Sequence, residues 1–165
     1  MELLDGRAAT TIGVVRTYTT RHGAGPLVTA DARLTAALPD AYNVHGPWQG
    51  DFRVGHFDAV AHRYAIEVSG GVDALAVTHA DVTATVPGLR VCRAYDHDTD
   101  RIVPGSRGDL DYQSELTGRM ENARPILDDT VPSPELIGEL LDRPVTVVSS
   151  GPTAADKKAS VTSIG

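Results

Sequence analysis

The chain has 165 residues, with 15 Lys or Arg against 22 Asp or Glu, and its formal net charge is −7 at pH 7. This length predicts one domain with a sizeable core. The acidic balance and the lack of a basic run argue against nucleic acid or an anionic membrane surface as a partner. Because no apolar stretch reaches the roughly 18 residues of a membrane helix and no secretion signal is recognisable, we expect a cytoplasmic protein with no membrane partner.

The first part of the chain predicts a strand, a loop and a short helix. Residues 11–20 are rich in β-branched and aromatic side chains, as expected of a strand. The loop over residues 21–26 has two glycines, the first being Gly23, which let the backbone approach a ligand closely, and Arg21, which can reach an anionic group. The alternative is a Gly-Pro turn with a solvated arginine. Residues 29–38 then predict a short helix.

The segment over residues 40–54 has no clear helix or strand pattern. A loop of this length is usually functional or mobile. Arg53 is its one fixed positive charge. This arginine can hold a carboxylate or phosphate with two hydrogen bonds, or it can form a surface ion pair.

A helix, a turn and a strand in succession predict the centre of the fold. Apolar residues recur at helical spacing over residues 57–68, and the glycine-containing turn at 69–71 ends that helix. Residues 74–77 form a continuous apolar run, typical of a strand buried on both faces, which delivers residues 78–81 to the sheet edge where ligands bind in α/β folds. Asp81 can there accept two hydrogen bonds from N1 and N2 of guanine, although capping or turning the chain is the commoner role of such a residue.

A further strand, an acidic run and a helix follow. Residues 89–95 alternate as a strand does, and Cys92 within them is expected to be a small core residue, since a single cysteine forms no internal disulfide. The acidic run 96–100 suggests either a cation cluster or a solvated hairpin tip. The tip is favoured because the run lacks the glycine and the distal glutamate of a calcium loop. Residues 111–127 contain a helical segment.

The C-terminal part predicts a second polar strand end. A helix over residues 135–142, capped by Ser133, precedes a strand at 145–148 that runs into the small polar tip 149–152. Two strands that end in polar tips can form two walls of one base pocket. The small, polar tail 153–165 is expected to be loose.

These elements predict an α/β fold with a mixed sheet flanked by helices and with residues 1–152 as a single domain. We expect the strands at 74–77, 89–94 and 145–148 to share one sheet. The sequence has no glycine-rich phosphate loop, no Cys or His set at metal spacing and no Gly-x-Ser-x-Gly elbow. Composition and spacing therefore lead to an α/β domain that can contact a nucleotide, and no further.

Six segments, in order along the chain, resemble motifs of the adenylosuccinate synthetase family. Residues 10–26 resemble the family's Gly-Val-Val-Lys-Ala-Tyr-Thr-Thr-Arg-Val-Gly-x-Gly-Pro. The other matches are to Gly-Trp-Phe-Asp-Ala-Val at 55–60, Thr-Lys-Leu-Asp-Val at 78–82, Val-Cys-x-Ala-Tyr at 91–95, Glu-Asn-Ala-Arg at 121–124 and Ser-Thr-Gly-Pro at 149–152. They cover nearly the whole chain but only the C-terminal part of the family's sequence. The implied fold is the C-terminal part of a P-loop-type purine ligase.

The resemblance implies a ligase of purine biosynthesis that couples IMP and L-aspartate using GTP and Mg²⁺. In the family, the Thr-Lys-Leu-Asp-Val and Ser-Thr-Gly-Pro motifs hold the guanine. This implies GTP-binding roles for Thr78, His79, Asp81, Ser149, Ser150 and Gly151. Arg21 and Gly23 would lie near IMP, and Arg53 remains a substrate-binding candidate.

The chain departs from the family at three points. His79 stands where the family has a lysine, although an imidazole can still stack on a base. Residues 46–54 replace an arginine-rich loop that binds the aspartate carboxylates, and only Arg53 keeps a charge, so the amine donor stays open. The phosphate loop and the catalytic aspartate and histidine belong to the family's N-terminal part. The resemblance therefore implies no catalytic residue and no Mg²⁺ ligand in this chain.

Three hypotheses follow from these observations. The chain is a fragment or subunit of the ligase that needs an N-terminal half or a homodimer partner. Alternatively, it is a non-catalytic module that binds guanine nucleotides or regulates a full-length enzyme. The third hypothesis is a ligase relative with a different amine donor or nucleobase. Under each of them we expect the isolated chain to be inactive.

Overall fold

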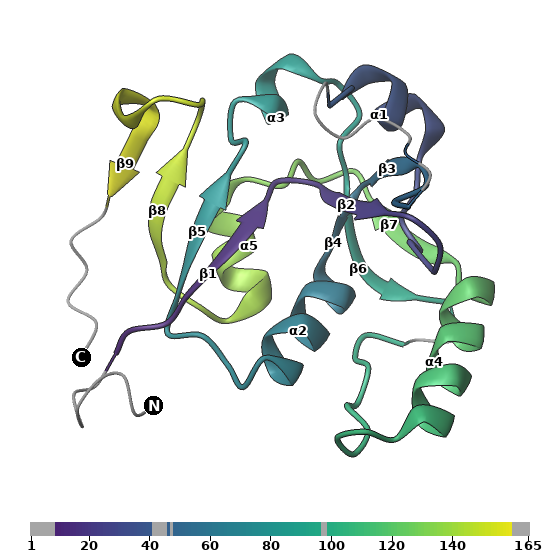
Figure 1. Cartoon of the computed structure of the whole chain (residues 1–165). Coiled ribbons are helices and arrows are strands. Elements are labelled where there is room, and N and C mark those ends of the chain that lie inside the picture. The colour runs from purple at the N-terminus through teal and green to yellow at the C-terminus, as the bar shows by residue number, and fades with distance from the viewer. Residues whose placement is uncertain (1–8, 41–45, 47, 97–98, 160–165) are drawn as a thin grey trace.

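The computed structural model describes residues 9–40, 46, 48–96 and 99–159 (Figure 1). Within this part of the chain the strands form three sheets. The largest has the order β1-β5-β8-β9, and its strands are β1 (Ile12–Arg16), β5 (Ala74–Thr78), β8 (Val145–Ser149) and β9 (Lys157–Ala159). The pairs β1–β5 and β5–β8 are parallel, and β9 runs antiparallel to β8.

Two smaller sheets lie beside the large one. Strands β2 (Thr19–His22) and β3 (Phe52–Gly55) form an antiparallel pair. The other sheet contains β4 (Phe57–Asp58), β6 (Val91–Tyr95) and β7 (Pro125–Asp128). The helices are α1 (Ala32–Ala37), α2 (Ala59–Val68), α3 (Val82–Thr85), α4 (Leu110–Asn122) and α5 (Pro134–Leu141). The α/β class with a mixed sheet flanked by helices is therefore confirmed.

Side-chain caps fix where the main helices begin. The carboxylate of Asp58 accepts from the backbone N–H of Ala61 at 3.0 Å and starts α2. The hydroxyl of Ser133, the predicted cap, accepts from the backbone N–H of Leu136 at 3.2 Å and starts α5. Such bonds satisfy backbone donors that have no partner inside the helix.

The main core lies between the large sheet and the two helices α2 and α5. Phe57, Leu75, Val77, Val91 and Ile137 are fully buried in it. Because these residues come from β4, β5, β6 and α5, the core joins the large sheet to the sheet that contains β6. Cys92 is buried in a neighbouring cluster, as predicted, and burial raises the pKa of its thiol to about 12.

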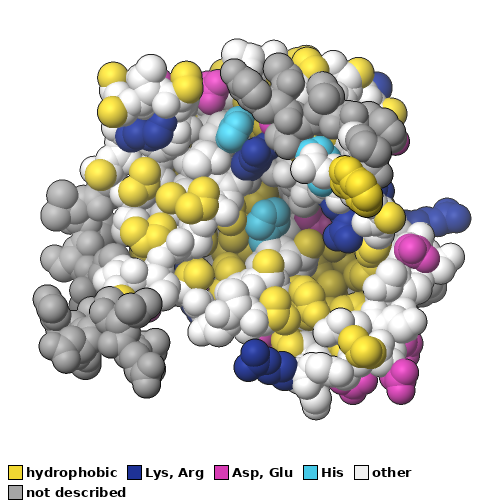
Figure 2. All heavy atoms as spheres, viewed as in Figure 1, with side chains coloured by type: hydrophobic (Ala, Val, Ile, Leu, Met, Phe, Trp, Pro, Cys, Tyr) yellow, Lys and Arg dark blue, Asp and Glu magenta, His cyan; other side chains and the backbone are white. Residues whose placement is uncertain are grey.

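The opposite face of the large sheet is open. Val14, Ala76 and Val147 are neighbours across β1, β5 and β8, and Val14 is 71% exposed. Figure 1 shows α5 behind the sheet, and Figure 2 shows apolar side chains on its front face. Parallel sheets are almost always covered on both faces, so this apolar face is an unusual surface.

The structure corrects two sequence predictions and confirms a third. The strand expected over residues 11–20 is two strands, because the chain leaves the large sheet at Thr17 and Tyr18. The strand around Cys92 does not share a sheet with β5 and β8, since β6 pairs with β4 and β7. The helical segment expected within 111–127 is confirmed as α4, which ends at Asn122 and is followed by β7.

The segment expected to be a loose tail also differs from the expectation. A 3₁₀ turn at Ala154–Asp156 leads into β9, which pairs with β8 through Val147, Val148 and Ser149. Residues 160–165 lie outside the described part, as do residues 97 and 98 of the acidic run. Among the described residues, no group of three or more His, Cys, Asp or Glu side chains could hold a metal ion, and no helix is long and apolar enough to span a membrane.

Candidate functional site

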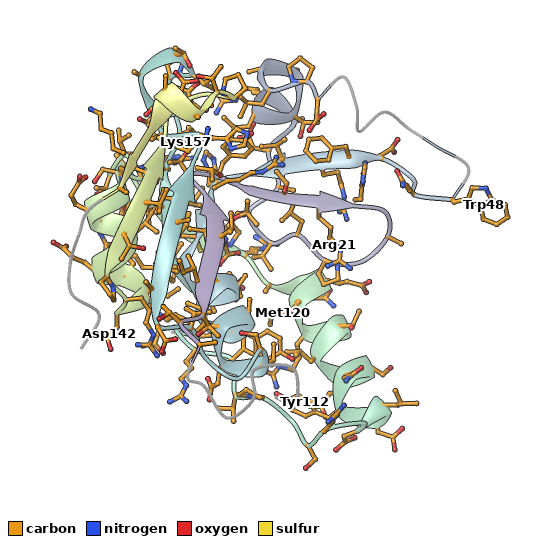
Figure 3. All side chains as sticks on the ribbon, turned by 60° about the vertical axis from the view of Figure 1, so that its left-hand side comes forward. Arg21, Trp48, Tyr112, Met120, Asp142 and Lys157 are labelled. Atoms are coloured by element: carbon orange, nitrogen blue, oxygen red, sulfur yellow. The ribbon has the colours of Figure 1, made fainter. Side chains whose placement is uncertain are left out.

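The ends of three strands surround a cavity of about 630 Å³, which we name the strand-end cavity. Five of the six residues predicted to bind GTP line it, namely Thr78, His79, Asp81, Ser149 and Gly151. The sixth, Ser150, is exposed and lies outside the lining. The other lining residues are Val14, Val15, Arg16, Pro152 and Lys157. Figure 3 places Lys157 at this end of the large sheet.

Hydrogen bonds between the strand ends hold the cavity walls together. The backbone N–H of Ala80 donates to the carbonyl of Ser149 at 3.0 Å, which joins the tips of β5 and β8. Thr17 joins the end of β1 to that of β5, because its N–H donates to the carbonyl of Thr78 at 3.2 Å and its hydroxyl to that of His79 at 2.8 Å. Parallel strands thus bring residues more than 60 positions apart to one edge of the sheet.

Asp81 lines the strand-end cavity, and its side chain does not cap the helix that follows. Asp81 precedes α3 in the cap position, yet its side chain makes no capping hydrogen bond. Its backbone carbonyl, by contrast, accepts from the hydroxyl of Thr85 at 3.2 Å. Asp81 is exposed and forms no ion pair with a described Lys, Arg or His. The commoner role of a strand-end aspartate, capping the next helix, is therefore not the one seen here.

His79 is held in an uncommon backbone conformation at the cavity wall. Its φ of 57° lies in the left-handed region, which non-glycine residues rarely adopt and which is often found at functional sites. Its ring meets the Tyr18 ring edge-on at a centroid distance of 5.4 Å, and Nδ1 lies 3.0 Å from the Thr78 hydroxyl. Burial, helped by the positive charge of Arg16, lowers the pKa of His79. At neutral pH the ring is uncharged and can stack on a flat ligand.

The second wall is a turn fixed by its own side chains. The Ser149 hydroxyl donates to the carbonyl of Gly151 at 3.1 Å. The ammonium group of Lys157 donates to the carbonyls of Gly151 and Thr153, at 2.6 and 2.9 Å. A Cβ at Gly151 would lie 2.7 Å from the carboxyl group of Asp156, so a larger residue here would have to displace that side chain.

Sequence reasoning missed Arg16 and Lys157 as cavity residues. Arg16 is the last residue of β1, but nothing in the sequence marks it as a strand end, because the β-branched and aromatic run continues to Thr20. Nothing in the sequence marks Lys157 as a cavity residue, because β9 is a short, exposed and polar strand. Its pairing with β8 is seen only in the folded structure.

A second cavity, of about 330 Å³, lies between α2, α4 and the loop after β2, and we name it the helix cavity. Its walls include Arg21, Leu27, Tyr64, Leu116 and Met120. Figure 2 shows the surface hollowed here over apolar side chains, and Figure 3 shows Arg21 and Met120 on the elements beside it. Arg21 thus lies at a different cavity from Asp81.

A buried carboxyl group forms part of the helix-cavity lining. Asp58 is 1% exposed, and the Tyr95 hydroxyl donates to its Oδ2 at 2.8 Å. Burial raises the pKa of Asp58, although its hydrogen bonds oppose the shift. Because both oxygens of Asp58 already accept protein hydrogen bonds, this group has a structural role as the cap of α2.

Arg53 holds the backbone of the glycine loop, a role that was not considered from the sequence. Its Nη2 donates to the carbonyls of Gly23 and Gly25, both at 2.7 Å. Arg21, which faces Arg53 across the β2–β3 pair, donates from Nε to the carbonyl of Ala24 at 3.0 Å. The two arginines therefore fix the conformation of the glycine loop, and neither Arg53 nor Gly23 lines the two cavities.

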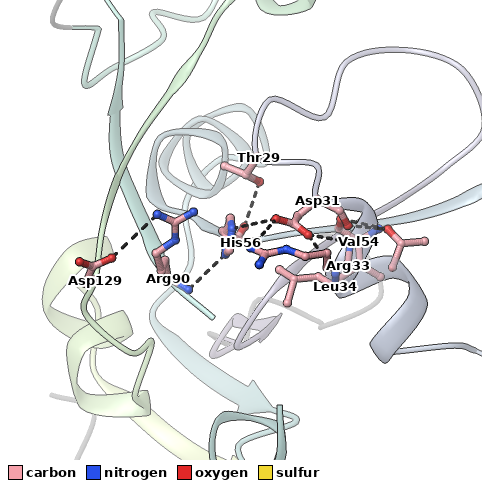
Figure 4. A network of polar contacts seen from close by, with 9 residues as sticks. Thr29, Asp31, Arg33, Leu34, Val54, His56, Arg90 and Asp129 are labelled. Atoms are coloured by element: carbon pink, nitrogen blue, oxygen red, sulfur yellow. Dashed lines mark hydrogen bonds and ion pairs between the residues drawn. The ribbon is translucent and has the colours of Figure 1, made fainter. Parts of the chain in front are cut away.

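His56 lies at the centre of a buried polar network away from both cavities (Figure 4). The backbone N–H of Arg90 donates to its Nδ1 at 3.2 Å, so the proton resides on Nε2. Nε2 has no hydrogen-bond partner among the described residues, and the nearest carboxylate oxygen, on Asp31, is 3.6 Å away. Burial, together with the charge of Arg90, lowers the pKa of His56.

Comparison with known proteins identifies the lineage of the chain. The family model described as adenylosuccinate synthetase matches residues 3–157. An adenylosuccinate synthetase of Synechococcus sp. WH7803 is 46% identical over 93 residues, which are 55% of this chain and 21% of that protein. The protein of that name from Parasynechococcus marenigrum is 33% identical over 154 residues, covering 85% of this chain and 35% of the relative.

The fold comparison agrees with the sequence comparison. The solved structure entitled fully ligated adenylosuccinate synthetase from Plasmodium falciparum has a TM-score of 0.65 and 18% identity, and covers 90% of this chain and 39% of that one. This likeness concerns the fold. The chain spans about a third or less of the curated relatives described here. On the family match over residues 3–157, the chain belongs to the adenylosuccinate synthetase family.

Proposed function

We propose that the strand-end cavity binds the guanine base of GTP, and that the chain is the guanine-binding part of a ligase that joins IMP and L-aspartate. The observation that carries this proposal is the carboxylate of Asp81, which lines a cavity and makes no capping bond. Family membership supports the reaction class. Because the chain spans about a third or less of these relatives, the complete reaction needs further protein, from a longer chain or from a partner.

The chemistry of the cavity favours guanine over adenine. An ionised carboxylate only accepts hydrogen bonds, and guanine offers two adjacent donors, the N1–H and the N2 amino group. Adenine has an acceptor at N1, which would face the carboxylate unfavourably. The neutral ring of His79 and the apolar side chains of Val14, Val15 and Pro152 offer surfaces for the flat base.

IMP is the ligand proposed for the side of the molecule that carries Arg21 and Gly23. The glycine loop is held by Arg53, so this arginine acts on the substrate through the loop. Mg²⁺ is required by the proposed reaction, but the described residues contain no group of three or more His, Cys, Asp or Glu side chains that could hold it.

The role of Arg53 favours a second candidate, a ligase relative with another amine donor. One guanidinium nitrogen of Arg53 already binds two carbonyls, which leaves less of the side chain to hold a dicarboxylate. If the donor is L-aspartate, the rate of the complete enzyme should rise with the L-aspartate concentration and then saturate. If the donor is a different amine, L-aspartate should leave the rate unchanged while another amine supports product formation.

The proposal is tested by the substitution Asp81→Asn. Removing one partner of a charge-assisted pair costs roughly 1.5–3 kcal/mol, or about ten- to hundredfold in affinity. The Kd for GDP, measured by calorimetry on the chain or on its complex with the remaining part of the enzyme, should rise by this factor. The affinity for ADP should stay nearly unchanged.

Asp142→Asn is the matched control for this experiment. Asp142 is fully exposed at the end of α5 and has a φ of 50°, which asparagine tolerates, so the substitution removes the same charge with little strain. It should leave both affinities unchanged. Equal losses for GDP and ADP in Asp81→Asn would assign Asp81 to the fold, and unchanged GDP binding would refute its proposed contact with the base.

A further inference from the structure

Arg16 brings a positive charge to the strand-end cavity from β1, the neighbour of β5, whose end leads to Asp81. It ends β1, next to Thr78 in the β1–β5 register, and lines the cavity. Its guanidinium carbon lies 5.7 Å from the centroid of the Tyr18 ring, whose edge also contacts His79. A cation over an aromatic face is held in place by the ring's quadrupole, so Arg16 has a defined position.

Arg16 forms no ion pair with a carboxylate within the described part of the chain. No carboxylate oxygen of a described residue lies within 4.0 Å of its guanidinium nitrogens, the limit for an ion pair, although Asp81 lines the same cavity. The cavity therefore presents a carboxylate and a guanidinium that do not neutralise each other. A ligand that suits both must offer donors on one edge and acceptors on another.

Guanine is such a ligand. Its N1 and N2 are donors, and the adjacent O6 and N7 are acceptors. The planar fork of an arginine matches O6 and N7, which is the commonest specific contact between proteins and guanine. Adenine instead places an amino donor beside N7, and this group would face the donor side of Arg16.

We propose that Arg16 donates hydrogen bonds to O6 and N7 of a guanine base whose N1 and N2 are held by Asp81. Arg16 is then a specificity-determining residue of the cavity. This inference rests on the proposed guanine site and adds the residue that reads the second edge of the base. Tyr18 is the positioning residue, since its ring packs against both Arg16 and His79.

The test compares guanosine, GMP and 7-deazaguanosine, which lacks N7, on the wild type and on Arg16→Met. One bidentate contact should account for roughly ten- to hundredfold in affinity. We expect Arg16→Met to weaken guanosine and GMP by the same factor. Wild type should bind 7-deazaguanosine more weakly than guanosine, and this difference should disappear in the variant, because the donor that reads N7 is gone.

Two further variants serve as controls for Arg16→Met. Arg16→Lys keeps the charge but loses the fork, so it should retain only part of the affinity for guanosine. Arg107→Met removes an exposed arginine that lines a different cavity, and should change none of the three affinities. Circular dichroism of each variant confirms that it folds.

The outcomes separate this inference from the proposed function. If wild type binds none of the guanine compounds, the guanine site is refuted, and the inference with it. If wild type binds them but Arg16→Met binds guanosine equally well, the inference alone is overturned. A loss for GMP without a loss for guanosine would also overturn it, because Arg16 would then contact the phosphate.

Discussion

His56 shows how much one buried side chain can couple stability to pH. It is 2% exposed and keeps one ring nitrogen without a hydrogen-bond partner among the described residues. Charging its ring would place a cation beside Arg90 and Arg33, with only Asp31 to offset it. The folded protein therefore holds His56 neutral, while the unfolded chain lets it titrate near its ordinary pKa of about 6.5.

The free energy of unfolding should consequently fall as the pH drops from 7.5 to 5.5. Because the pKa of His56 is lowered by folding, its stabilisation is complete above the unfolded pKa and is lost as the pH falls toward the folded one. One such histidine changes stability by up to ~1.4 kcal/mol per pH unit. His62, whose pKa burial also lowers, adds to the slope.

Urea denaturation at three pH values measures this slope, and His56→Asn isolates the contribution of His56. The asparagine oxygen can accept from the backbone N–H of Arg90 but does not titrate. The variant should be less stable at pH 7.5 and should have a shallower pH dependence. An unchanged slope would show that His56 is not the group whose titration destabilises the fold.

Among the elements, those with strong local patterns could be predicted and those defined by distant contacts could not. The helix that ends at Val68 and the strand at Ala74–Thr78 follow from periodicity and glycine placement. The break at Thr17 could not be predicted, because it depends on bonds to Thr78 and His79, which lie 61 and 62 residues away along the chain. Periodicity also cannot say which sheet β6 joins, since all buried strands look alike.

The same distinction applies to the candidate site. The polar ends of β5 and β8 were recognisable because each follows an apolar run. The bonds of Arg53 to two loop carbonyls were not, because an arginine in an irregular segment fits many partners. Arg16 was read as part of a longer strand, so its place at a strand end was not seen.

Helix α5 depends on its cap. Ser133→Ala removes the acceptor for the backbone N–H of Leu136, and the loss of such a cap typically costs about 1 kcal/mol. Since α5 supplies Ile137, Leu140 and Leu141 to the main core, the whole fold should lose this stability. Urea denaturation should show a lower midpoint with an unchanged slope. Ser114→Ala, on the exposed side of α4, is the control and should not be destabilising.

At the scale of the whole molecule, the chain contains one part of the machinery that the proposed reaction requires. Phosphoryl transfer depends on positioning and on charge stabilisation around the phosphate. The guanine site proposed here would anchor the nucleotide by its base. We expect the purified chain to release no phosphate from GTP and to form no adenylosuccinate, in assays with IMP, L-aspartate and Mg²⁺. Turnover above that of a mock purification would contradict this expectation.

The open face of the large sheet also determines how the molecule behaves in concentrated solution. β1 is an edge strand that carries exposed Ile12 and Val14, a combination that favours strand addition between molecules. At pH 7 the net charge of −7 keeps copies apart, but protonation of those histidines that the fold does not hold neutral reduces the magnitude of this charge as the pH falls. Light scattering should therefore increase as the pH falls from 7 toward 5, and Val14→Lys should suppress the increase more than Val103→Lys, which changes an exposed valine elsewhere. The exposed apolar face of the large sheet thus makes the colloidal stability of the protein depend on pH.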